Sequence, residues 1–91
     1  MPKTEVVLYT KSNCSLCDKM KAEMARAGCD DLYTLKAVDI ESDPELFARY
    51  RYDIPVLCIN GVEAFKHRLT AADFRERLLS SITTQSQGPP G

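Results

Sequence analysis

The spacing of apolar and polar residues divides the chain into strands and helices. Residues 4–10 form an apolar, β-branched run that predicts a buried strand. Residues 15–27 carry apolar side chains at helical spacing, which predicts an amphipathic helix of about three to four turns. The apolar stripe of this helix consists of Leu16, Met20, Met24 and Ala27. Gly28 follows where a left-handed cap commonly ends a helix.

A second strand and a second helix are expected next. Residues 32–40 alternate partly between apolar and polar side chains, and a strand there would run parallel to the first. Ser42 or Asp43 can cap a helix whose first turn holds Pro44, and Ser42 and Glu45 match the spacing of a capping box. The buried face of this short helix would consist of Leu46, Phe47 and Tyr50.

The following segment predicts a hairpin. Two apolar runs flank Asn60-Gly61, which is a strong hairpin signal, so the third and fourth strands should be antiparallel. Pro55 opens the third strand, where a missing N–H is tolerated. On sequence pattern alone, this proline either only marks the start of the strand or is a cis proline kept for its position.

The last helix closes a single domain. Thr70 can cap it, and Phe74, Leu78 and Leu79 would face the sheet. Residues 83–91 are polar and end in Gly and Pro, which predicts a disordered tail after a domain that spans residues 1–82. The resulting order is β-α-β-α-β-β-α, an α/β fold with a four-stranded mixed sheet and flanking helices.

Composition and charge argue against several classes of function. The 91 residues are 44% hydrophobic and 27% charged, as in an ordinary soluble globular domain. A net charge of −1 gives no electrostatic support for nucleic-acid or membrane binding, and no apolar run approaches the ~18 residues of a membrane span. No signal peptide is visible, so we expect a cytoplasmic protein, or a mitochondrial one if a transit peptide was removed.

The four cysteines add candidate chemistry. Cys14 and Cys17 are separated by two residues, whereas Cys29 and Cys58 stand alone and read as small hydrophobic residues. This spacing favours a catalytic or metal-binding pair in a reducing compartment over a secreted disulfide scaffold.

The pair lies at a strand-to-helix junction, which suits redox chemistry. Cys14 would sit at the helix N-terminus, where unpaired N–H groups and the helix dipole stabilise a thiolate, and Lys11 would add electrostatic support. Cys14 is therefore the expected nucleophile. Cys17, one turn into the helix, is the expected resolving thiol.

Two other interpretations stay open. A metal site needs further ligands, and zinc within one chain would have to recruit Cys58 or His67, while a cluster shared by two chains would need one thiolate from each. His67, with Lys66 and Arg68, forms a small basic cluster. That cluster is either a solvated loop or an anion- or substrate-binding patch.

Residues 9–17 and 54–61 resemble the glutaredoxins, within the thioredoxin-like fold. The resemblance implies that Cys14 and Cys17 are the nucleophilic and resolving thiols. It also implies that Lys11 helps to hold the carboxylate of glutathione, that Pro55 is cis, and that the backbone of Ile54 pairs with the substrate.

The sequence departs from the common family pattern around the ligand. Ser15 and Leu16 stand between the thiols where Pro and Tyr are common. Residues 65–66, Phe and Lys, replace a Gly-Gly pair that binds the γ-glutamyl end of glutathione, and Arg68 replaces an acidic residue. Residues 50–56 and the pair His67-Arg68 are closer to an atypical small glutaredoxin-like group.

These observations predict a glutaredoxin-like thiol–disulfide oxidoreductase. Its partner would be a disulfide-containing protein or a glutathione mixed disulfide, with no bound cofactor or metal and with glutathione as a candidate reductant. We expect a monomer. The predicted substrate-binding residues are Lys11, Ile54, Pro55, His67 and Arg68. The alternatives are a metal or iron–sulfur module that uses the same thiols and a catalytically weak interaction domain.

Overall fold

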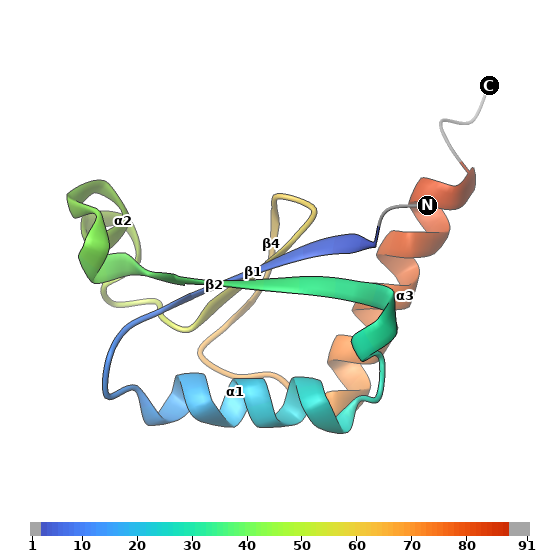
Figure 1. The fold of residues 1–91 in the computed structure, drawn as a ribbon, viewed down its shortest axis with the longest axis horizontal. Coiled ribbons are helices and arrows are strands. Elements are labelled where there is room, and N and C mark those ends of the chain that lie inside the picture. The colour runs from blue at the N-terminus through green and yellow to red at the C-terminus, as the bar shows by residue number, and fades with distance from the viewer. Residues whose placement is uncertain (1–2, 88–91) are drawn as a thin grey trace.

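The structure, a computed structural model, describes residues 3–87 (Figure 1). Its strands and helices follow the expected order, with short 3-10 turns at Asp30–Leu32 and Ile40–Ser42. The elements are β1 (Thr4–Thr10), α1 (Ser15–Arg26), β2 (Tyr33–Asp39), α2 (Pro44–Tyr50), β3 (Val56–Ile59), β4 (Val62–Lys66) and α3 (Ala71–Gln87). Among the described residues, no helix is long and apolar enough to cross a membrane.

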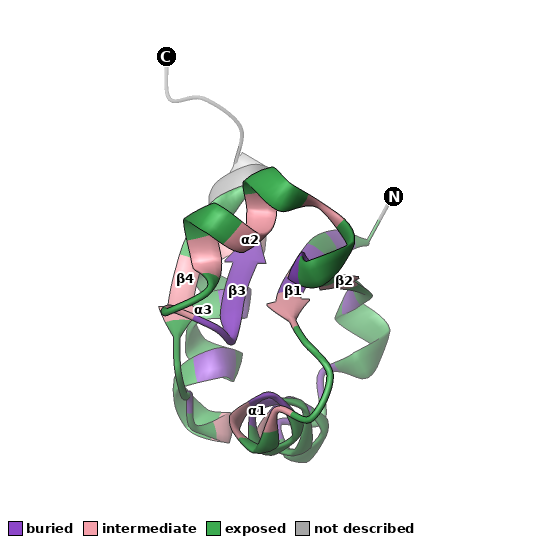
Figure 2. Cartoon of the chain, turned by 90° about the vertical axis from the view of Figure 1, so that its left-hand side faces the viewer, coloured by how far each residue is buried: buried purple, intermediate pink, exposed green. Residues whose placement is uncertain are grey.

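The four strands form one mixed sheet in the order β2-β1-β3-β4. β1 is parallel to β2 and antiparallel to β3, and β3 is antiparallel to β4. Helix α1 lies below the sheet in the end-on view, and α2 lies above it (Figure 2). The predicted mixed sheet with flanking helices is therefore confirmed.

The main core lies between the sheet and the pair α1 and α3, which contact each other. Phe74 on α3 is fully buried, and its ring meets the ring of Tyr33 edge to face, with the centroids 5.3 Å apart. The other fully buried members of this cluster include Val6, Leu8, Met20, Met24, Leu57 and Leu78. Met20, Met24 and Ala27 of the predicted stripe thus face the core, whereas Leu16 is only partly buried and lies outside it.

Local turn chemistry agrees with most of the sequence signals. Gly28 has φ +70° after α1, and Asn60 and Gly61 have φ +52° and +80°, as a two-residue hairpin turn of type I′ requires. Of the two candidate caps of α2, Asp43 is used, since its carboxylate accepts the N–H of Glu45 at 2.9 Å. The hydroxyl of Ser42, the other candidate, instead donates to the carbonyl of Asp39.

The last helix runs further than its sequence pattern predicts. Thr70 caps it as predicted, because its hydroxyl oxygen accepts the N–H of Asp73 at 3.1 Å. The backbone then stays helical to Gln87, so the expected boundary at residue 82 falls inside α3. Residues 83–87 are polar but contain no Gly or Pro, so nothing in them breaks a helix. The remainder of the predicted tail, residues 88–91, lies outside the described residues.

Candidate active site

The two paired cysteines lie at the start of α1, after the loop that follows β1. Asn13 adopts φ +57° and turns the backbone into the helix. Cys14 is the N-cap of α1 and is joined to Cys17 by a disulfide, with the two Cα atoms 5.2 Å apart. The Sγ atom of Cys14 also accepts the backbone N–H of Cys17 at 3.1 Å. The sulfur therefore satisfies one of the unpaired N–H groups at the start of the helix.

The two sulfurs differ in their exposure. The side chain of Cys17 is only 1% exposed, whereas Cys14 is half-buried. Cys17 forms a second, smaller apolar cluster with Ile40 and Ile54. The partly buried side chains that pack against this cluster are Tyr9, Cys14, Leu46, Phe47 and Tyr50. A reagent from solvent can thus reach Cys14, whereas Cys17 is packed against apolar side chains.

The peptide bond between Ile54 and Pro55 is cis, as the family resemblance implied. The N–H of Ile54 donates to the carbonyl of Tyr50 at 3.1 Å, and the N–H of His67 donates to the carbonyl of Pro55 at 2.8 Å. The carbonyl of Ile54 receives no hydrogen bond from the rest of residues 3–87. It is the polar group that this loop can offer to an extended peptide.

The predicted basic cluster is brought only partly together. His67 has φ +67° and is exposed, and Arg68 is exposed beside it. The ammonium of Lys66 instead pairs with Glu63 at 3.1 Å and Asp53 at 3.9 Å. Its hydrogen bond to Glu63 raises the pKa of Lys66, whose positive charge is thereby largely balanced. His67 and Arg68 are therefore the members of the cluster that can still bind a ligand.

Lys11 lies exposed in the loop that leads from β1 to Cys14. Tyr9 precedes this loop, and its ring stacks on that of Tyr50, with the centroids 4.6 Å apart and the planes 24° from parallel. The guanidinium of Arg49 lies over the ring of Tyr50, 5.7 Å from its centroid. This side of the dithiol thus combines aromatic and cationic groups.

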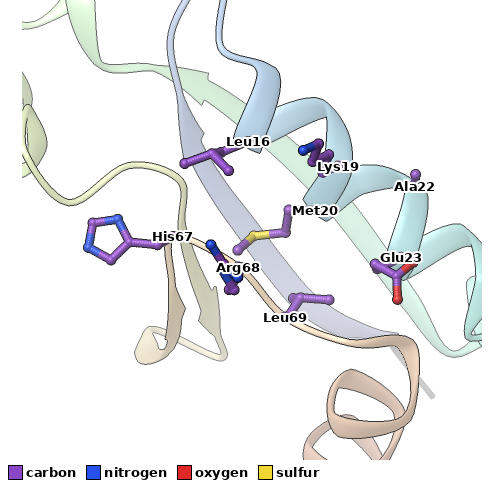
Figure 3. A pocket seen from close by; sticks show the side chains of 8 residues that line it. All are labelled: Leu16, Lys19, Met20, Ala22, Glu23, His67, Arg68 and Leu69. Carbon is purple, nitrogen blue, oxygen red and sulfur yellow. The ribbon is translucent and has the colours of Figure 1, made fainter.

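A groove of about 320 Å³ lies on the other side, between α1 and the loop that joins β4 to α3 (Figure 3). Leu16, which stands between the two cysteines, lines one end of it. The other lining residues are Lys19, Met20, Ala22, Glu23, His67, Arg68 and Leu69. Two of the predicted substrate-binding residues, His67 and Arg68, therefore lie beside a groove that starts at the dithiol.

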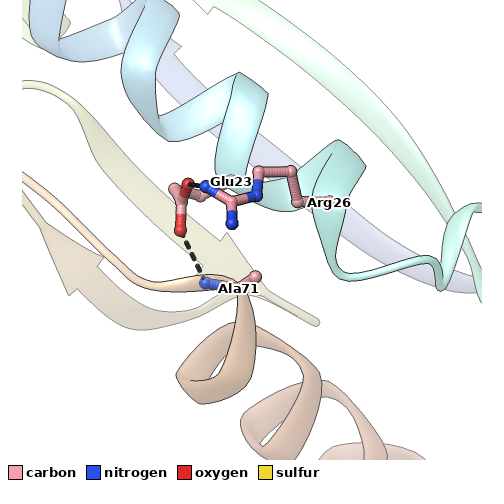
Figure 4. Close-up of polar contacts among 3 residues, drawn as sticks. All are labelled: Glu23, Arg26 and Ala71. Atoms are coloured by element: carbon pink, nitrogen blue, oxygen red, sulfur yellow. Dashed lines mark hydrogen bonds and ion pairs between the residues drawn. The ribbon is translucent and has the colours of Figure 1, made fainter.

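Glu23 has a role that the sequence did not indicate. One carboxylate oxygen accepts the N–H of Ala71, the first residue of α3, at 3.0 Å, and the other pairs with Arg26 at 3.0 Å (Figure 4). No local sequence signal indicates this contact, because it joins residues 48 positions apart. It ties the C-terminal half of α1 to the start of α3, beside the groove that Glu23 lines.

The remaining cysteines are buried. Cys29 is 2% exposed and Cys58 is 7% exposed, and burial raises the pKa of the Cys58 thiol. Within the part of the chain that the structure describes, no three side chains of His, Cys, Asp or Glu come together as a metal site would require. A zinc site that recruits Cys58 or His67 has no such set of ligands there.

The sequence matches a known family of domains and a curated relative. The family model described as "Glutaredoxin-like domain (DUF836)" matches residues 5–79. A curated relative, "Glutaredoxin-like protein YDR286C homolog" of Dictyostelium discoideum, is 31% identical over 67 residues, which are 67% of this chain and 62% of the relative. The chain thus spans about three fifths of the length of that relative.

Solved structures give the same fold. The structural genomics target protein XcR50 from X. campestris superposes with a TM-score of 0.72 at 25% identity, over 82% of this chain and 96% of that one. Chloroplastic thioredoxin z superposes with a TM-score of 0.71 at 18% identity, over 90% of this chain and 80% of that one. The glutaredoxin-like family match, the thioredoxin-like fold and the Cys14–Cys17 disulfide together support a thiol-redox role. Because this family model matches most of the chain, the chain belongs to the glutaredoxin-like domain family.

Proposed function

We propose that the protein is a dithiol–disulfide oxidoreductase in which Cys14 attacks and Cys17 resolves. The Cys14 thiolate attacks one sulfur of a substrate disulfide, forms a mixed disulfide and releases the other sulfur as a thiolate. The Cys17 thiolate then attacks Sγ of Cys14 and releases the second substrate thiol. Two electrons pass from the protein dithiol to the substrate, and the protein is left with the Cys14–Cys17 disulfide.

The observation that carries this proposal is the unequal exposure of two disulfide-bonded cysteines at a helix start. A nucleophile must be reached by its substrate, and Cys14 is half-buried with its sulfur at the N-terminus of α1. A resolving thiol must meet the mixed disulfide but not the solvent, and Cys17 is 1% exposed. Because the bridge closes a loop of very few residues, it adds little stability and suits a bond that opens and closes.

The neighbouring loop suits substrate docking. The free carbonyl of Ile54 can accept one backbone hydrogen bond from an extended segment of the substrate. Pro55 fixes the direction of this carbonyl, and exposed Lys11 adds positive charge near the attacked sulfur. The substrate is a protein disulfide or a glutathione mixed disulfide. Regeneration requires two glutathione thiols or the dithiol of a protein reductase.

Trapping of the mixed disulfide tests the assignment of the two thiols. Cys17→Ser, incubated with a peptide disulfide, should accumulate one stable peptide adduct on Cys14, detected by mass spectrometry. Cys14→Ser should form no adduct at the same time points, because the remaining thiol is buried. An adduct on Cys17 in Cys14→Ser, formed as fast as that of the first variant, would reverse the assignment.

The same preparation tests the metal alternative and the identity of the reductant. Stoichiometric zinc or iron by elemental analysis, lost in Cys14→Ser, would support the metal-binding module instead. Addition of reduced glutathione to the oxidised protein should yield a glutathione adduct at Cys14 if glutathione is the reductant. If glutathione fails and a protein dithiol reductase reduces the bridge, the electron donor is a protein.

A further inference from the structure

We infer that the groove beside the dithiol binds an acidic segment of a disulfide-bonded protein substrate. This inference rests on the proposed function, and it names the chemistry that this function selects. The groove begins at Leu16, between the two cysteines, and follows α1 as far as Glu23. A substrate held there would extend directly from the sulfur that Cys14 attacks.

The charged side chains that line the groove without an ion-pair partner are positive. Lys19 and Arg68 line it, both are exposed, and neither pairs with a carboxylate among residues 3–87. The one acidic residue that lines the groove is Glu23, and its two carboxylate oxygens are occupied by Ala71 and Arg26. The whole chain carries a net charge of −1, so this local excess of positive charge is not a general property of the surface.

The shape and the floor of the groove suit a peptide. The eight residues from Leu16 to Glu23 span about 10 Å of helix, which matches roughly three residues of an extended chain. The side chains of Leu16, Met20 and Leu69 point into the space between α1 and the loop (Figure 3). An apolar side chain fits this floor, and a carboxylate next to it can reach Lys19 or Arg68.

The rim is also linked to the docking loop. The N–H of His67 donates to the carbonyl of Pro55, and the N–H of Arg68 donates to the carbonyl of Lys66 at 2.7 Å. The imidazole of His67 turns away from α1 (Figure 3), which leaves Arg68 as the cation that this loop presents to the groove. Backbone docking at Ile54 and side-chain docking in the groove can therefore serve one substrate segment.

Glutathione fits the groove less well. It carries an ammonium group as well as two carboxylates, and the groove offers no uncommitted carboxylate for that ammonium, because Glu23 already has two partners. An acidic peptide has no such unpaired cation. The charge pattern therefore favours a protein segment.

Paired peptides and paired variants test the inference. The reduced protein is mixed with the symmetrical disulfide of a short peptide whose single Cys is followed by Glu and Leu, or with the same peptide carrying Gln for Glu. The readout is the rate at which the Cys14–Cys17 disulfide forms while two peptide thiols are released. We expect the acidic peptide to react about fivefold faster at low salt, since two exposed cations each add a modest attraction, and less so at high salt.

The ratio of the two rates should approach one in Lys19→Glu and in Arg68→Glu. Lys21→Glu is the matched control, because Lys21 is an exposed lysine of the same helix that does not line the groove, and it should keep the wild-type ratio. Equal rates with both peptides in the wild type would overturn the inference and leave the proposed function intact. Failure to oxidise the dithiol with either peptide would instead overturn the proposed function.

Glutathione disulfide serves as the third substrate. If Lys19→Glu and Arg68→Glu slow the reaction with glutathione disulfide but leave the ratio for the peptides unchanged, glutathione occupies the groove and the inference is wrong. If they lower the ratio for the peptides, an acidic protein segment is the occupant.

Discussion

Replacement of Glu23 by alanine should destabilise the protein measurably, although the Glu23 side chain is only partly buried. The substitution removes the acceptor of the Ala71 N–H, which begins α3, and the partner of Arg26. A hydrogen bond to a charged group contributes about 1.5–3 kcal/mol. The Glu23 side chain is 28% exposed, so water can partly replace it and the lower end, about 1.5 kcal/mol, applies.

The ion pair contributes much less. The side chain of Arg26 is 74% exposed, and such a pair is worth about 0.3–0.5 kcal/mol. The two contributions together come to about 2 kcal/mol, so Glu23→Ala should lower the unfolding temperature by about 7–16 °C in a domain of this size. Glu23→Gln keeps an oxygen that can accept the Ala71 N–H, so it should lose roughly half as much.

Thermal and urea unfolding followed by circular dichroism measure these differences. Arg26→Ala separates the ion pair from the hydrogen bond, and Glu76→Ala, at an exposed position of α3, controls for the higher helix propensity of alanine. A stabilising Glu23–Ala71 hydrogen bond is ruled out if Glu23→Ala lowers the free energy of unfolding no more than Arg26→Ala does. The same holds if Glu23→Gln is as unstable as Glu23→Ala.

Three further predictions concern buried side chains. Phe74→Ala should lower the free energy of unfolding in urea by about 3–5 kcal/mol, because the ring is fully buried against Tyr33; a loss below about 1 kcal/mol would contradict this packing. Burial and the Asp30 carboxylate raise the pKa of Tyr33 from 10.0 to about 12, so the folded chain keeps a proton that the unfolded chain loses between these values. Stability is therefore complete below pH 10 and falls as the pH rises toward 12, and ultraviolet titration should show one late tyrosine that Tyr33→Phe removes. Oxidised native protein should not react with iodoacetamide at pH 8.5, whereas unfolding in urea should release two reactive thiols, since Cys29 and Cys58 are buried; rapid native labelling of either one would show that its pocket opens.

Local sequence signals were sufficient for much of the fold. The apolar run of β1, the Asn60-Gly61 turn and Gly28 each specify a conformation through neighbouring residues only, and the structure has all three. The cis geometry of Pro55 was different, because the pattern around it allowed either isomer and only the family resemblance implied cis. The polar composition of residues 83–87 predicts disorder, yet the backbone of α3 stays helical to Gln87, because no residue among them breaks the helix.

The candidate site was predictable only in part for the same reason. The spacing of Cys14 and Cys17 is local, and it placed both thiols at the start of α1. The partner of Glu23 and the ion pairs of Lys66 are set by tertiary contacts, so the sequence could not show that one acid and one base were already committed. These two contacts determine which charges remain beside the dithiol, and the groove became apparent only in three dimensions.

The sulfur of Cys14 is at once a member of the disulfide and the acceptor of the Cys17 N–H that begins α1. A charged acceptor forms a shorter and stronger hydrogen bond than a neutral one. The Cys17 amide proton therefore senses directly whether that sulfur is a disulfide or a thiolate. One backbone resonance in a ¹⁵N-labelled sample is thus a built-in reporter of the oxidation state, and it can follow turnover without a dye or a coupled enzyme.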